Sequence, residues 1–195
     1  SKQAKRGICS TIKRAKNVKK STFHSSQRQI VTLPNSTEAS PYDVVIIGGG
    51  PGGYTSAIKA GQQGLKTAII ESRGVLGGTC LNDGCVPSKA LLNATSHYYN
   101  VKNNFSQYGM VGLDKVSLDH DLIMKCKDTV VDNIEKNINQ LIHKNKVDYI
   151  QGFGTITSAN TVDVKLNESG DNHKMFAKNI IIATGSEANI IPGVI

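Results

Sequence analysis

The first strong pattern of apolar positions lies at residues 42–47, YDVVII, a short run rich in β-branched side chains. Apolar runs of this kind are typical of parallel strands that are buried on both faces. A segment with helical patterning follows at residues 54–63, and a second apolar run follows at residues 66–70. The order of strand, helix and strand predicts a βαβ unit with a parallel sheet.

The longest amphipathic pattern covers residues 118–144 and predicts one long helix with Ser117 as its N-cap. A shorter helix is expected to open at residues 86–92. Residues 103–116 are expected to form a polar connection in which Met110–Val111 is buried. The apolar positions of the long helix recur near helical spacing. They are Leu122, Ile123, Val130, Val131, Ile134, Ile138, Leu141 and Ile142.

Short strand-like runs close the chain, and glycines such as Gly152 and Gly154 separate them. They lie at residues 147–150, 154–157, 161–166 and 175–177. These runs predict an antiparallel meander. A last apolar run at residues 179–183 predicts another buried parallel strand, which ends in the small-residue turn Thr184–Ser186. The pattern as a whole predicts a Rossmann-like α/β fold in which ligands bind at the carboxyl ends of the parallel strands.

The turn after the first strand has the G-x-G-x-x-G pattern at Gly48, Gly50 and Gly53. Gly48 allows a tight turn, Gly50 lets a pyrophosphate approach the backbone, and Gly53 lets the helix pack on the strand. The N-terminus of that helix then faces the phosphates. Glu71 ends the second strand, where an acidic residue binds a ribose hydroxyl. The alternative is a glycine-rich loop without a ligand, but the ordered strand, glycines, helix and acid favour a dinucleotide site.

Two cysteines, Cys80 and Cys85, have four residues between them, a spacing that permits a small disulfide ring. Cys80 follows two glycines, and Cys85 opens the expected helix, whose N-terminus favours a thiolate. A C-x4-C pair alone is a poor zinc site, and structural disulfides are unusual in reducing compartments. The pair therefore predicts redox chemistry. Cys9, Cys126 and the scattered histidines have no such spacing, and no metal site is expected.

The basic charge of the chain is concentrated at its beginning. The 195 residues carry a formal charge of +8, but residues 1–37 hold nine Lys or Arg and no acidic residue. The segment is rich in Ser and Thr, and Phe23 is its one aromatic residue. These features favour a mitochondrial transit peptide over a nucleic-acid-binding tail or plain disorder.

A segment with turn and breaker residues, 33–41, separates this arm from the first strand. We expect the mature boundary between residues 34 and 41. The expected organisation is a transit peptide with linker at residues 1–40 and a nucleotide-binding domain at residues 41–195. The apolar runs are too short to span a membrane.

Four motifs together resemble those of the pyridine nucleotide-disulfide oxidoreductases. They are GGGPGGY at 48–54, GGTCLNDGCVPSKALL at 77–92, GFGTI at 152–156 and ATGSE at 183–187. The resemblance runs from Tyr42 to Ile195, and Pro87-Ser88-Lys89 is similar to the branch of the family that acts on lipoamide. It implies an FAD-binding domain that is incomplete at its C-terminus and ends near the start of an NAD-binding domain.

The resemblance also implies roles for individual residues. Cys85 would face the flavin, Cys80 would exchange with the substrate, and Lys89 would lie near the reactive edge of the flavin. The implied FAD-binding residues are Gly48, Gly50, Pro51, Gly52, Gly53, Glu71, Ser72, Arg73, Gly77, Gly78, Thr79, Cys80, Lys89, Gly154, Thr184, Gly185 and Ser186. NAD would be a co-substrate, and its site and a His-Glu base would lie beyond residue 195.

The implied activity is oxidation of dihydrolipoamide, carried on the lipoyl domains of 2-oxo acid dehydrogenase complexes, with hydride passed to NAD. The full-length enzyme would be a homodimer of the mitochondrial matrix, with neither nucleic acid nor membrane as a partner. This chain alone is expected to be inactive. The alternatives are a disulfide reductase of the glutathione or mercuric reductase type, and a non-catalytic FAD-binding fragment.

Asp83 departs from the pattern of the family, which usually has an apolar residue at this position between the cysteines. A carboxylate beside the thiols disfavours a thiolate through like-charge repulsion. With the Asp83 side chain directed to solvent, we expect this effect to be modest.

Overall fold

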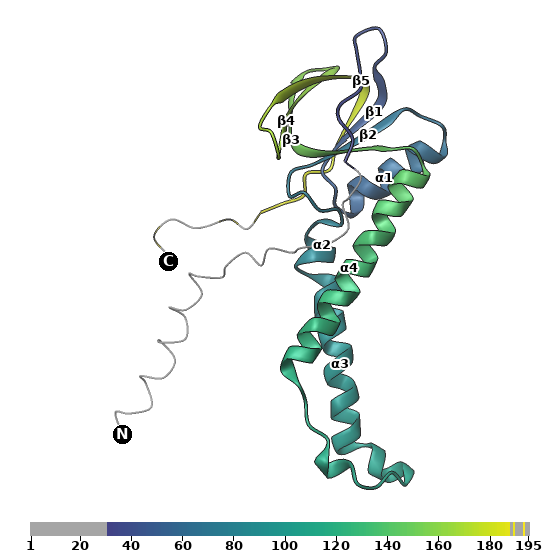
Figure 1. Ribbon diagram of the computed structural model, residues 1–195, viewed down its shortest axis with the longest axis vertical. Helices are drawn as coiled ribbons and strands as arrows, with labels where there is room; N and C mark the ends of the chain where they lie inside the picture. The colour runs from purple at the N-terminus through teal and green to yellow at the C-terminus, as the bar shows by residue number, and fades with distance from the viewer. Residues whose placement is uncertain (1–30, 188, 190–192, 194–195) are drawn as a thin grey trace.

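The computed structural model describes residues 31–187, 189 and 193, so residues 1–30 of the expected transit peptide and linker at 1–40 lie outside the described residues. The strands gather at one end of the molecule, and two long helices extend from them as an antiparallel arm (Figure 1). The elements are β1 (Tyr42–Ile47), α1 (Pro51–Gln62), β2 (Thr67–Glu71), α2 (Gly78–Asn82), α3 (Cys85–Asn103), η2 (Phe105–Tyr108), η3 (Leu113–Lys115), α4 (His120–Lys144), β3 (Asp148–Ser158), β4 (Thr161–Leu166) and β5 (Asn172–Ile182). The predicted α/β fold, with its βαβ unit and parallel sheet, is confirmed.

The sheet has a parallel part and an antiparallel part that share two strands. β1 pairs in parallel with β2 and β5, and β2 pairs in parallel with β3. β3 and β5 then continue beyond the parallel part and pair antiparallel with β4 on either side, which closes the circuit of five strands. The carboxyl ends of β1, β2 and β5 therefore lie side by side at one edge.

The two long strands were each expected as two short ones, and this expectation is wrong. Residues 148–150 and 154–157 both belong to β3, and residues 175–177 and 179–182 both belong to β5. Gly152 lies inside β3 and does not interrupt it. A Cβ at this position would lie 2.6 Å from the carbonyl oxygen of Lys165 on β4. The glycine allows two strands to approach closely within a continuous ladder.

The parallel strands are buried on both faces, as their unbroken apolar runs predict. One core cluster joins Val44, Ile46 and Ile69 to side chains of α1, α2 and α4, among them Ala57, Leu81, Val131, Ile138 and Ile142. The other cluster joins Val45, Ile47 and Ile70 to the antiparallel strands through Val162, Val164 and Met175. The molecule thus has helices, a parallel sheet and a meander in layers, which holds the strand ends in place.

The long helix α4 begins two residues later than the expected 118. Asp119 is its N-cap, and its side chain accepts a hydrogen bond from the Leu122 backbone N–H at 2.9 Å. The prediction of Ser117 as the N-cap is therefore wrong, because Asp119 competes for the same role with a charged acceptor. Although α4 has 25 residues, no helix in the described part of the chain combines the length and apolar character needed to cross a bilayer.

The connection between α3 and α4 lies at the far end of the helical arm, away from the strands (Figure 1). Met110 and Val111 are 48% and 90% exposed there, so their predicted burial is wrong. Gly109 and Gly112 take positive φ angles and turn the chain around them. An apolar dipeptide at such a tip has no core within reach.

The chain around the start of the expected linker at 33–41 is bound to the fold. Thr32 donates its backbone N–H and its hydroxyl to the carbonyl oxygen of Tyr149 on β3, at 2.8 and 3.1 Å. The Ser36 hydroxyl accepts the backbone N–H of Phe176 on β5 at 2.9 Å. The segment therefore contacts two strands that are not neighbours in the parallel sheet.

Candidate nucleotide and dithiol site

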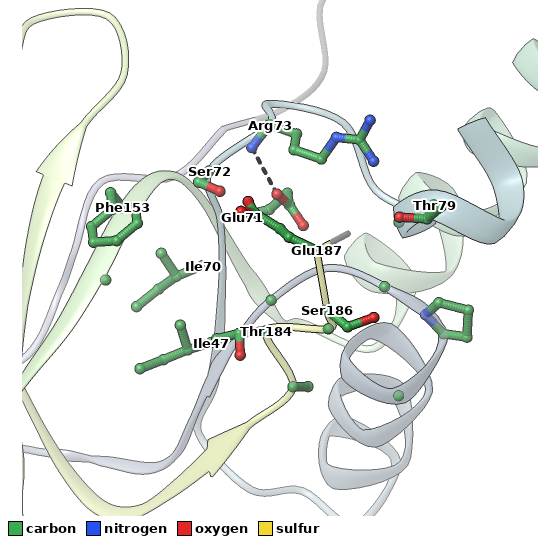
Figure 2. A pocket seen from close by; sticks show the side chains of 18 of the residues that line it. Ile47, Ile70, Glu71, Ser72, Arg73, Thr79, Phe153, Thr184, Ser186 and Glu187 are labelled. Carbon is green, nitrogen blue, oxygen red and sulfur yellow. Dashed lines mark hydrogen bonds between the residues drawn. The ribbon is translucent and has the colours of Figure 1, made fainter. Parts of the chain in front are cut away.

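A cavity of about 1050 Å³ opens where β1, β2 and β5 end. This volume is at the upper end of the roughly 300–1,000 Å³ that small-molecule sites occupy, which suits a ligand as large as a dinucleotide. Figure 2 shows Phe153 beside Ile47 and Ile70 at one end and Thr79 of α2 at the other. The cavity lies at the edge where the strand order predicts a ligand.

The glycine loop between β1 and α1 forms one wall, and its contacts agree with the predicted roles. Gly48 has a φ of +108°, and a Cβ there would lie 2.2 Å from the carbonyl oxygen of Ala183. A Cβ at Gly53 would lie 1.8 Å from the carbonyl oxygen of Gly48. No side chain larger than hydrogen fits either position without moving the backbone.

The start of α1 faces the cavity with its backbone. Gly50 is the N-cap and makes no side-chain cap, Pro51 opens the helix, and both residues line the cavity together with Gly52. A Cβ at Gly50 would meet nothing closer than 3.8 Å, so the space over this glycine is open. The first N–H groups of a helix have no partner within the helix, and they attract phosphate groups.

Glu71 holds the loop in place through a buried carboxylate, which is 6% exposed. One oxygen accepts the backbone N–H of Gly49 and the other accepts that of Arg73, each at 2.7 Å. A carboxylate has about four lone-pair sites, so two acceptor sites remain. Because Glu71 also lines the cavity, its oxygens have the capacity to accept hydrogen bonds from two ribose hydroxyls.

The first cysteine lies on a short helix, α2, that the sequence patterns did not predict. Gly77 and Gly78 both take left-handed conformations, with φ angles of +105° and +60°. The Asn82 side chain donates to the carbonyl oxygens of Leu76 and Gly78, which closes the turn. This turn brings Cys80 to the cavity wall.

The second cysteine, Cys85, is the first residue of α3 and is exposed. Both cysteines are free thiols in the structure. The pKa of Cys80 is raised, chiefly by its hydrogen bond to the Cys85 side chain, then by desolvation and by charge on Cys85, while the Cys85 backbone N–H acts in the opposite direction. The two side chains therefore lie within hydrogen-bond reach of each other, as the spacing predicts.

Most of the residues predicted to bind a nucleotide line the cavity. Three do not: Gly53 and Gly77 support it from behind, and Lys89 is exposed one turn along α3. Cys85 also lies outside the lining. The residues that line the cavity as predicted are Gly48, Gly50, Pro51, Gly52, Glu71, Ser72, Arg73, Gly78, Thr79, Cys80, Gly154, Thr184, Gly185 and Ser186.

Sequence reasoning missed several lining residues. They are Ile47, Ile70, Asp83, Gly152, Phe153, Ala183 and Glu187. Ile47, Ile70 and Ala183 adjoin the predicted turns, so their position at strand ends was a usable signal. Phe153 stands between two glycines of β3 and is 63% exposed, which is unusual for an aromatic side chain. Its ring and the two isoleucines give the cavity an apolar end that suits a flat base.

Asp83 is not simply directed to solvent. Its carboxylate oxygen Oδ2 lies 2.5 Å from Nη2 of Arg73, and each side chain is about half exposed. The side chain is thus partly exposed to solvent, as expected, and it is also paired with a guanidinium, which the sequence did not predict. Within the described residues, no group of three His, Cys, Asp or Glu lies close enough together to hold a metal ion.

The nucleotide cavity and the adjacent thiol pair define the class of protein. The sequence pattern of the pyridine nucleotide-disulphide oxidoreductases matches residues 42–194, and the chain belongs to this family. Over 153 residues, 78% of the chain, it is 49% identical to a dihydrolipoyl dehydrogenase of Trypanosoma brucei brucei, of which it covers 32%. It is also 53% identical over 152 residues to a mitochondrial dihydrolipoyl dehydrogenase of Dictyostelium discoideum, covering 78% of the chain and 31% of that protein.

A third relative carries a different name. The chain is 51% identical over 174 residues to a leghemoglobin reductase of Vigna unguiculata, covering 87% of the chain and 33% of that protein. The chain thus spans about a third of the length of the curated relatives it matches.

Proposed function

We propose that this chain is the FAD-binding portion of a mitochondrial dihydrolipoyl dehydrogenase. The observation that carries the proposal is the contact between Cys80 and Cys85 at the wall of a cavity that fits a dinucleotide. Relatives of that name are 49–53% identical to the chain in T. brucei brucei and D. discoideum. The thiol pair and the cavity would also suit other disulfide reductases. Together with the identity to these relatives, they favour the lipoamide branch.

The residues present fit FAD. Glu71 has two acceptor sites left for the ribose of the adenosine half, and the backbone at Gly50–Gly52 is open to a pyrophosphate. Thr184–Ser186 and the Gly78–Cys80 segment line the remaining wall. FAD, when bound, supplies the two-electron acceptor between the thiol pair and NAD. The chain binds and orients it and sets the thiols beside it.

The cysteines perform thiol–disulfide exchange with the substrate. In the oxidised protein Cys80 and Cys85 form a disulfide, and a thiolate of dihydrolipoamide attacks the sulfur of Cys80. The bond between the two cysteines breaks as a mixed disulfide forms, and Cys85 leaves as the thiolate. The second thiolate of the substrate then displaces Cys80, which releases lipoamide and a reduced cysteine pair. The substrate has lost two electrons, and the protein has gained them.

The finer assignments form part of the same proposal. The substrate is dihydrolipoamide on lipoyl domains of 2-oxo acid dehydrogenase complexes, and NAD is the co-substrate, bound outside this chain. The full-length protein acts as a homodimer in the mitochondrial matrix. Several of the relatives carry "mitochondrial" in their names, which supports this location. The 195 residues alone bind FAD without turnover.

Steady-state kinetics of the full-length, FAD-loaded protein test this proposal. We expect NADH formation from NAD that depends on dihydrolipoamide and is abolished by Cys80→Ser and by Cys85→Ser. Cys126→Ser is the matched control, because Cys126 is an exposed thiol on α4 outside the cavity. Turnover with glutathione disulfide and NADPH, without turnover of dihydrolipoamide, would instead assign the protein to another disulfide reductase. FAD binding without turnover of either substrate would favour a non-catalytic role.

A further inference from the structure

The segment between the two cysteines carries a negatively charged side chain, Asp83. Asp83 is three residues after Cys80 and two before Cys85. It caps the C-terminal end of α2, where its backbone N–H donates to the carbonyl oxygen of Thr79 at 2.9 Å. The start of the side chain is therefore fixed relative to the cysteines. An unpaired carboxylate here would disfavour a thiolate on either sulfur.

Arg73 approaches Asp83 from a different part of the fold. Its backbone N–H is bound to the buried carboxylate of Glu71, which anchors the residue to the end of β2. Its side chain runs toward α2, the helix that carries Thr79 (Figure 2), and the guanidinium reaches Asp83. Both residues line the cavity. The ion pair thus ties the turn after β2 to the segment that holds the cysteines.

We propose that Arg73 is a positioning residue for the Cys80–Cys85 pair, and that it acts by holding the Asp83 carboxylate and offsetting its charge beside the thiols. The proposal concerns the chain itself and holds whether or not a cofactor is bound.

The thiol pair also has other influences on its pKa. The causes that raise the pKa of Cys80 are its contacts with Cys85 and desolvation. Other charged groups lie on the elements around the pair. They are Glu71 and Glu187 at the cavity, Lys89 on α3, and Glu135 and the Lys127–Asp128 pair on α4, which packs against α2 and α3. These surrounding charged groups are the same in variants that change only Arg73 and Asp83, so a difference between the variants reports on the ion pair.

The size of the effect follows from the exposure of the ion pair. Both side chains are about half exposed, at 45% and 54%, so solvent and salt screen the interaction. We expect a shift in thiol reactivity of roughly 0.2–0.7 pH units, the size that exposed charge pairs produce. The shift decreases as ionic strength rises, because the Debye length shortens to about 3 Å at 1 M salt.

The test is the pH profile of thiol alkylation in the reduced 195-residue chain, with iodoacetamide as the probe and peptide mass spectrometry to separate the cysteines. Arg73→Gln leaves Asp83 without its partner and raises the midpoint for the Cys80–Cys85 pair. Asp83→Asn leaves Arg73 as an unpaired cation and lowers the midpoint. The double variant returns close to the original value, and Arg73→Lys retains it.

Two controls keep the result specific. Cys126, an exposed thiol on α4, keeps the same midpoint in every variant and serves as an internal reference. Lys178→Gln removes a comparable ion pair, with Asp43 at 2.7 Å, and leaves the thiol midpoints unchanged. Circular dichroism checks folding. If Arg73→Gln does not fold, the downward shift in Asp83→Asn and its loss in 1 M salt carry the test.

The proposal is overturned if Arg73→Gln and Asp83→Asn leave the midpoints unchanged. It is equally overturned if both variants shift them in the same direction, because a purely structural role of the ion pair produces that pattern. Failure of lipoamide turnover in the full-length protein would leave this result intact, so the two proposals fail separately.

Discussion

At the residue scale, glycines and one buried acid determine the candidate site. Gly48 and Gly53 are required by contacts with backbone oxygens, and Glu71 joins two segments of backbone with its two carboxylate oxygens. These three residues were predictable from the sequence, because their positions follow from local turn geometry and the ends of two strands. The Arg73–Asp83 ion pair was not, since it depends on how a turn and a helix end lie in three dimensions.

The helix–strand contact at Gly53 gives a stability prediction. In Gly53→Ala the new Cβ would lie 1.8 Å from the carbonyl oxygen of Gly48, and the backbone must shift. We expect the free energy of unfolding to fall by about 1–3 kcal/mol. Gly52→Ala is the matched control on the same helix, because its Cβ would meet nothing closer than 4.0 Å. That variant keeps or slightly gains stability through helix propensity.

Urea unfolding of the two variants provides the measurement. Equal stability of Gly53→Ala and Gly52→Ala would contradict the close packing of α1 on the loop after β1.

At the element scale, the sequence predicted which segments are helices and strands better than where they begin and end. The apolar runs of β1 and β2 and the amphipathic pattern of α4 were clear, because buried faces impose their own periodicity. The bounds of β3 were missed, because Gly152 and Gly154 resemble breaks in the sequence, yet Gly152 allows β4 to approach closely within a continuous ladder. The short helix α2 has too few residues to show a period, so its pattern could not have been recognised.

The start of α4 offers a second stability prediction. Asp119→Ala removes the hydrogen bond to the Leu122 backbone N–H and a negative charge at the helix N-terminus. We expect a loss of about 0.5–2 kcal/mol in the free energy of unfolding. Ser117→Ala, at the position the sequence suggested, is expected to change it by less than about 0.5 kcal/mol. A larger loss of stability in Ser117→Ala than in Asp119→Ala, measured by thermal or urea unfolding, would contradict Asp119 as the N-cap.

At the scale of the whole molecule, the layers explain why the site lies where it does. Helices cover one face of the parallel sheet and the meander covers the other, so the edge at the carboxyl ends of the strands is where a large cavity opens. The fold class and this edge could be predicted from the order of the elements. The binding of residues 32–36 to β3 and β5 could not, because polar side chains in a Ser- and Pro-containing segment carry no signal of their partners.

The central claim is that the cysteine pair exchanges electrons with a flavin held in this cavity. The most direct measurement is an anaerobic titration of the FAD-loaded full-length protein with dihydrolipoamide, followed by visible absorbance. The account predicts a long-wavelength band after two electrons, from the Cys85 thiolate lying against oxidised flavin, which Cys85→Ser abolishes and Cys126→Ser preserves. Bound flavin that shows no such band at any point of the titration would contradict it.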